Sequence, residues 1–221
     1  IRLQITIHAK KSNNPSLIAL GYNDVAFIYS KQYKESGSNK KYIDSAFMYN
    51  RKALPYIEKM ENNNFKKYLT SLCDFNYGSY LMVLHQYDES IEYFNKALEI
   101  SKNVDVLKEL NLPFIYMGLA CNYEYLNQWD LAEKYYLKSI DVTSSDGNIA
   151  SKKIINTKYL ASVYAYRKNY VKAYEFQVKA ADLITAYSEK QKNKSLKTIE
   201  ILKTKEKAES INKLKLEKKN E

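Results

Sequence analysis

Apolar side chains recur at helical spacing through residues 15–187, in four copies of one pattern. In the clearest copy, Tyr116 is followed by Leu119, the small Ala120 and Tyr123, and a second apolar stretch opens at Ala132. The other copies each centre on a small residue with a large apolar residue three positions later: Ala26 and Tyr29, Gly78 and Leu81, Ala161 and Tyr164. Each copy therefore predicts two amphipathic helices.

The spacing between these positions is nearly constant. Nine residues separate the large residue of the first stretch from the small residue of the second in three copies, as from Tyr123 to Ala132. The first copy carries an insertion over the polar sequence KESGSNKK. The next small residue follows seven positions later in all four copies, which is two helical turns on one face. Small residues at this stride allow two antiparallel helices to approach closely.

These features predict an all-α fold, a right-handed α-α superhelix of antiparallel helix pairs with a long C-terminal helix. We expect the four repeats at about residues 15–62, 63–104, 105–146 and 147–187. Residues 1–14 are interpreted as the second helix of a truncated repeat. Pro113 either opens or kinks the first helix of the third copy, because residues 105–112 are also compatible with a helix.

The pattern resembles the tetratricopeptide repeat, an aromatic-x2-Leu-Gly-x2-Tyr motif followed by Ala-x3-Phe-x2-Ala. Asp74 and Thr157 replace the first aromatic residue, Asn50 and Gln177 replace the phenylalanine, and the copies are longer than usual. The resemblance implies a domain that binds a polypeptide along a concave face lined by the first helix of each copy.

The expected groove consists of the residues of each first helix that point away from its partner helix. They are Asn23, Phe27 and Lys31; Phe75, Ser79 and Met82; Met117, Cys121 and Tyr125; and Lys158, Ser162 and Tyr166. Aromatic and methionine side chains with a few lysines suit a peptide that carries apolar anchors and an acidic group. Core packing is the alternative for Phe75, Met82 and Met117.

Residues 188–221 form a Lys/Glu-rich segment without glycine or proline, which predicts a helix. We expect residues 189–203 to cap the last repeat, and the rest to extend into solvent or pair with a partner, so this helix is a candidate homodimer contact.

A tetratricopeptide array followed by such a helix resembles the sensor region of bacterial histidine kinases and helix-turn-helix regulators. The resemblance implies a ligand-sensing part of a membrane-linked signalling or transcription-regulatory protein, periplasmic, whose membrane contact lies in a segment outside these residues. A freestanding cytoplasmic adaptor is the alternative. The chain begins at Ile1 without a methionine or signal peptide, which is typical of a piece cut from a longer protein.

Composition narrows the chemistry. The net charge is +10, but no dense Lys/Arg cluster occurs in the repeats, so nucleic-acid binding is not predicted. Two histidines, His8 and His85, and two cysteines, Cys73 and Cys121, have no spacing typical of a metal site or a nucleophile-base pair. We therefore predict neither an enzyme nor a metal or cofactor. No apolar run approaches the ~18 residues of a membrane span.

Overall fold

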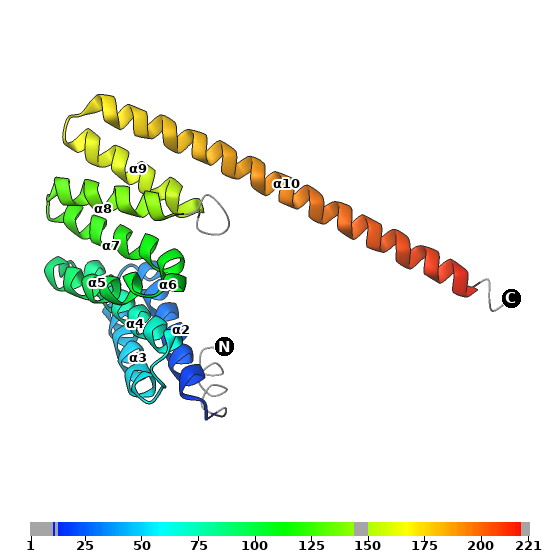
Figure 1. Cartoon of the computed structure of the whole chain (residues 1–221), viewed down its shortest axis with the longest axis horizontal. Helices are drawn as coiled ribbons and strands as arrows, with labels where there is room; N and C mark the ends of the chain where they lie inside the picture. Colours follow the sequence, from blue (N-terminus) through cyan, green and yellow to red (C-terminus); the bar gives the residue numbers. More distant parts are fainter. Residues whose placement is uncertain (1–10, 12, 144–149, 218–221) are drawn as a thin grey trace.

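The computed structural model describes residues 11, 13–143 and 150–217, and it consists of helices joined by short turns (Figure 1). The first two repeats are α2 (Pro15–Glu35) with α3 (Lys40–Glu58), and α4 (Asn64–Val83) with α5 (Tyr87–Lys102). The third comprises α6 (Asp105–Leu110), α7 (Leu112–Tyr125) and α8 (Trp129–Val142). The last comprises α9 (Ala150–Tyr166) and α10 (Tyr170–Glu217).

The helices pack in the order of the chain. α2 packs on α3, α4 on α5, α7 on α8, and α9 on α10, and each pair packs on the next. Three of the small residues that the repeat singles out, Ala26, Ala120 and Ala161, are buried in these contacts. A β-carbon on Gly78 would lie 3.1 Å from the Ser90 carbonyl oxygen of the partner helix. The expected all-α stack of antiparallel pairs is therefore confirmed.

The constant nine-residue spacing has a structural cause in the turn between paired helices. His85, Asn127 and Lys168 occupy the same place in three copies, and each has a positive φ of 56–62°. After each of them a backbone N–H donates to the carbonyl five residues earlier, as from Gln86 to Leu81 at 3.0 Å. A helix that ends with one residue in the left-handed conformation fixes the length of the turn. It therefore also fixes the nine-residue spacing between the two helices of a pair.

Two polar side chains, Asn50 and Gln177, replace the repeat's usual phenylalanine, and their burial depends on whether another helix covers them. Asn50 is buried beneath α4, and its amide donates to the Cys73 carbonyl at 3.0 Å, because a covered polar group needs a partner. Gln177 occupies the same position in the last copy, where no described helix of a further repeat covers α10, and it is exposed.

Pro113 lies in the first turn of α7, and Asn111 separates that helix from the short α6. The first helix of the third copy is thus broken into two. Pro113 begins its second part, where the missing N–H has no hydrogen bond to lose.

The predicted long C-terminal helix is confirmed, but its course differs from the prediction for residues 189–203. α10 runs unbroken from Tyr170 to Glu217, and Figure 1 shows it projecting away from the stack. Residues 188–207 are all exposed, including Leu196, Ile199 and Leu202. The prediction that residues 189–203 cap the last repeat is wrong, because no glycine or proline interrupts the helix and turns it back over α9. The second helix expected in residues 1–14 lies almost entirely outside the described residues.

Candidate functional site

The first helices of the four repeats stand next to one another, with α2 against α4, α4 against α7, and α7 against α9. We call the side that they turn away from their partner helices the first-helix face. Phe27, Tyr125 and Tyr166 on this face are 55%, 61% and 70% exposed, and Lys31 places its Nζ 5.9 Å from the centre of the Phe27 ring. Aromatic rings this exposed contribute little to the core and are available to a ligand.

Asn23 is a correction to the expected groove. It is 2% exposed, and its amide nitrogen lies 3.3 Å from the Ala19 carbonyl and 3.4 Å from the Cys73 sulfur. The side-chain amide of Asn76 donates a hydrogen bond to the side-chain oxygen of Asn23 at 3.3 Å. Since α4 covers α2 at this point, Asn23 joins two repeats and does not line an open surface.

Phe75 borders an apolar hollow on the first-helix face. The hollow has a volume of about 240 Å³ and is lined by Tyr68, Leu72, Phe75, Asn111 and Phe114 of α4, α7 and the residue between α6 and α7. The Phe75 ring also lies 5.5 Å from that of Phe94 in the core. Phe75 therefore combines the two roles that the sequence left open, since one side packs and the other lines the hollow.

The remaining central residues of the expected groove are half-buried. Ser79 and Met82 lie on α4, where the Ser79 hydroxyl donates to the Phe75 carbonyl at 2.8 Å. Met117 and Cys121 pack against the core between α7, α8 and α9. Burial raises the pKa of the Cys121 thiol to about 11, so it is a poor nucleophile at neutral pH.

A carboxylate that the sequence did not single out lies beside Cys121. The buried Tyr136 of α8 donates its hydroxyl to Glu124 Oε2 at 2.6 Å, and this hydroxyl is 3.3 Å from the Cys121 sulfur. Tyr159 of α9 stacks on the Tyr136 ring at 5.7 Å. Burial raises the pKa of Glu124, and the Tyr136 hydrogen bond lowers it in part.

Lys158, Ser162 and Tyr166 of α9 are exposed at the last repeat, as expected for groove residues. Lys158 and Ser162 also border an open hollow of about 650 Å³ between α9 and α10, together with Tyr170, Tyr174 and several alanines of the two helices. The Tyr166 ring stacks on Trp129 at 5.5 Å, as Tyr125 stacks on Tyr87 at 5.0 Å.

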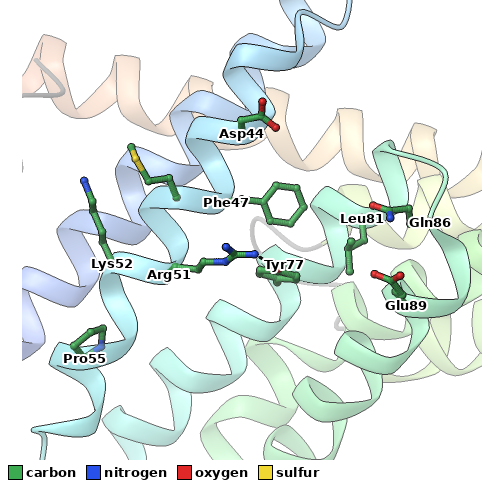
Figure 2. A pocket seen from close by; sticks show the side chains of 10 residues that line it. Asp44, Phe47, Arg51, Lys52, Pro55, Tyr77, Leu81, Gln86 and Glu89 are labelled. Carbon is green, nitrogen blue, oxygen red and sulfur yellow. Dashed lines mark hydrogen bonds between the residues drawn. The ribbon is translucent and has the colours of Figure 1, made fainter.

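A larger hollow of about 760 Å³ lies between α3 and the turn from α4 to α5. Figure 2 shows Arg51 pointing to Tyr77, whose hydroxyl oxygen accepts its hydrogen bond at 2.8 Å. Asp44, Arg51, Lys52 and Glu89 at its rim are exposed, so their charges are solvated. Solvated charges of both signs give this hollow little selectivity for one ligand.

The structure offers no support for a metal site, because no cluster of three or more His, Cys, Asp or Glu occurs in the described part of the chain. His85 lies in the turn before α5, where its Nδ1 is 2.6 Å from the Tyr87 hydroxyl. Within residues 11, 13–143 and 150–217, no helix has the length and apolar character to span a bilayer.

Asp74, which replaces the first aromatic residue of its repeat, is expected to make the free energy of unfolding depend on pH. Burial raises its pKa to about 6, and Lys96 partly opposes the shift. The pKa of Asp74 in the unfolded chain is near 4, so folding disfavours its ionised form. The resulting loss of stability is complete above pH 6 and disappears below pH 4. We expect Asp74→Asn to raise the free energy of unfolding by about 1 kcal/mol at pH 7.5, since this partly solvated site is screened.

Urea unfolding at pH 7.5 and pH 4 measures this effect, with Asp44→Asn at an exposed site as the control. The gain from Asp74→Asn should vanish at pH 4. An equal gain at both pH values would show that the ionised carboxylate is not disfavoured.

Comparison with known proteins gives a family match for the middle of the chain. Residues 69–145 match the model of the tetratricopeptide repeat. No curated protein matches the sequence. The match covers the second and third copies, including α4, α5, α7 and α8.

Two solved structures resemble the chain. The crystal structure of BtubC (BKLC) from P. vanneervenii matches with a TM-score of 0.65 and 16% identity, over 79% of this chain and 66% of that one, so the match spans just under two thirds of BtubC. The MamA RS-1 ArsTM double mutant is 14% identical over 76% of this chain and 97% of that one, with a TM-score of 0.32. The likeness to BtubC shows a shared fold. Residues 69–145 thus match the tetratricopeptide repeat, a domain type that generally binds proteins and is typically non-catalytic.

Proposed function

We propose that this protein binds a polypeptide segment along the first-helix face. The observation that carries the proposal is the set of exposed aromatic side chains on the first helices α2, α7 and α9, namely Phe27, Tyr125 and Tyr166. Aromatic side chains are the commonest anchors of protein interfaces. The hollow beside Phe75 accepts one apolar side chain of the ligand, and the exposed Lys31 and Lys158 accept an acidic group.

The second part of the proposal is that the repeats are the ligand-sensing part of a bacterial signalling or transcription-regulatory protein. It is supported by α10, which packs on α9 and continues without a break beyond residue 188. A helix this continuous carries a tilt of the last repeat to whatever follows it. The proposed location is periplasmic in an inner-membrane protein. A freestanding cytoplasmic adaptor is the alternative.

Two observations separate the sensor from the adaptor. A hydrophobic span encoded downstream of Glu221 supports the sensor, and a stop codon at that point removes it. Spin labels on Lys138 of α8 and Lys203 of α10 should report a changed distance when a peptide binds. An unchanged distance contradicts transmission through α10.

The exposed Leu196, Ile199 and Leu202 also make α10 a proposed homodimer contact, since apolar side chains at this spacing share one face of a helix. Sedimentation equilibrium of the full chain tests this, and a monomer at 100 μM contradicts it.

Binding to the first-helix face predicts a specific mutational effect. Peptides selected from a random 12-residue phage library on the parent chain should bind the Tyr125→Ala/Tyr166→Ala variant at least tenfold more weakly, as measured by fluorescence anisotropy. Both side chains are exposed, so helicity by circular dichroism should not change.

The control is Leu137→Ala/Val171→Ala, which removes two exposed apolar side chains from the second helices α8 and α10. It should bind like the parent. Equal affinity for the first-helix variant, or a library without any binder, contradicts the proposed function.

A further inference from the structure

Three helices meet at Glu124. Glu124 lies in the last turn of α7, and its carboxylate accepts a hydrogen bond from Tyr136 of α8. The ring of Tyr159 of α9 stacks on that of Tyr136. Burial raises the pKa of Tyr159, and the charges of Cys121, Glu124 and Tyr125 add to the shift. Glu124 is thus the chain neighbour of Tyr125 and is connected through Tyr136 to Tyr159, and both of these tyrosines are exposed.

No cationic partner of the Glu124 carboxylate is found in the part of the chain that the structure describes. Among the described residues, the ion pairs join Lys108 to Asp105, and Arg167 to Asp130 and Glu133, and none includes Glu124. Its observed partner is the neutral hydroxyl of Tyr136, which orients one carboxylate oxygen, and no described residue donates a hydrogen bond to the other oxygen. A half-buried carboxylate without a counter-charge is costly and is usually compensated by a cation.

We propose that Glu124, with Tyr125 and Tyr159, forms a subsite for a cationic side chain, lysine or arginine, of the bound polypeptide. The inference rests on the proposed function, and it specifies the chemistry of one position of the ligand. The carboxylate supplies a charge-assisted hydrogen bond, and the faces of the two tyrosines attract a cation.

The surrounding residues favour a cation over other ligand groups. An acidic side chain would face the Glu124 carboxylate, and an apolar one would leave that carboxylate desolvated without a partner. Tyr136 also gives the site a fixed geometry, because its ring is buried and its hydroxyl holds Oε2 in place. Lys158, the neighbouring residue on α9, is exposed and makes no ion pair with Glu124 in the described structure, so it leaves the subsite open.

The test selects peptides from the random 12-residue library separately on the parent chain, Glu124→Gln and Glu124→Lys. On the parent, we expect lysine or arginine at one position, at a fixed distance from an apolar residue. Glu124→Gln should lose this preference and keep the apolar one, and Glu124→Lys should select aspartate or glutamate there. The control is Glu92→Lys at an exposed site of α5, which should select the same peptides as the parent.

A second measurement changes the peptide and leaves the protein intact. Replacing the selected lysine or arginine by norleucine should weaken binding to the parent about tenfold, and binding to Glu124→Gln less than twofold. If peptides bind the parent and depend on Tyr125 and Tyr166, but neither basic residues nor position 124 matter, this inference is overturned and the proposed function stands. If no peptide binds the parent, both are overturned.

Discussion

Replacing Phe94 by alanine is expected to lower the free energy of unfolding by about 4 kcal/mol. The Phe94 side chain is 1% exposed and lies between α4 and α7, where it joins the second repeat to the third. Its ring contacts Phe75 at 5.5 Å and leaves no room for a side chain at Gly118. Removing the ring opens a cavity. The neighbouring helices are held in place by their other contacts and cannot move in to fill it.

Chemical unfolding followed by circular dichroism measures the loss. The matched control is Phe27→Ala, the same substitution at an exposed position, which should cost less than about 1 kcal/mol. Equal costs at the two positions would show that Phe94 is not a core residue. A repeat array can also unfold in segments, so a split transition for Phe94→Ala is consistent with the loss of an interface between repeats.

The second large effect is expected at Gly118. A β-carbon built there would lie 2.5 Å from Cζ and 2.6 Å from Cε1 of Phe94, closer than non-bonded atoms approach. The Phe94 ring is enclosed and cannot swing away. Gly118→Ala should therefore lower the free energy of unfolding by about 2 kcal/mol, even though alanine is the better helix former by ~1 kcal/mol.

A double-mutant cycle isolates this clash. Gly118→Ala introduced into a Phe94→Leu background should be nearly neutral, because the shorter side chain leaves space for a methyl group. If Gly118→Ala costs the same with phenylalanine and with leucine at position 94, the close approach of α5 and α7 is not the cause.

The helix pairs could be predicted from the sequence, because the constant spacing between small residues reflects a turn of constant length. His85, Asn127 and Lys168 hold that turn, each with a left-handed backbone. The same spacing did not reveal Gly118, whose need for glycine arises from a ring on another helix. It also did not show that residues 189–203 project away from the last repeat, because the absence of glycine and proline favours a helix without giving its direction.

The first-helix face was predictable only in part. Phe27, Tyr125 and Tyr166 are exposed as expected, whereas Asn23 is buried, because the spacing does not tell which residue the next first helix covers. Glu124 was missed since its importance depends on the Tyr136 hydroxyl that reaches it from α8. One signal was available: a tyrosine at the usual phenylalanine position carries a hydroxyl that needs a buried partner.

The most direct test of the account is where a bound peptide touches the protein. With p-benzoylphenylalanine placed at position 125 of α7 or at position 137 of α8, a selected peptide is bound and irradiated, and the cross-links are identified by mass spectrometry. Both positions are exposed, so the probe itself should be tolerated at each. Binding along the first helices predicts cross-links from position 125 and none from position 137. Equal or stronger cross-linking from position 137 would contradict it.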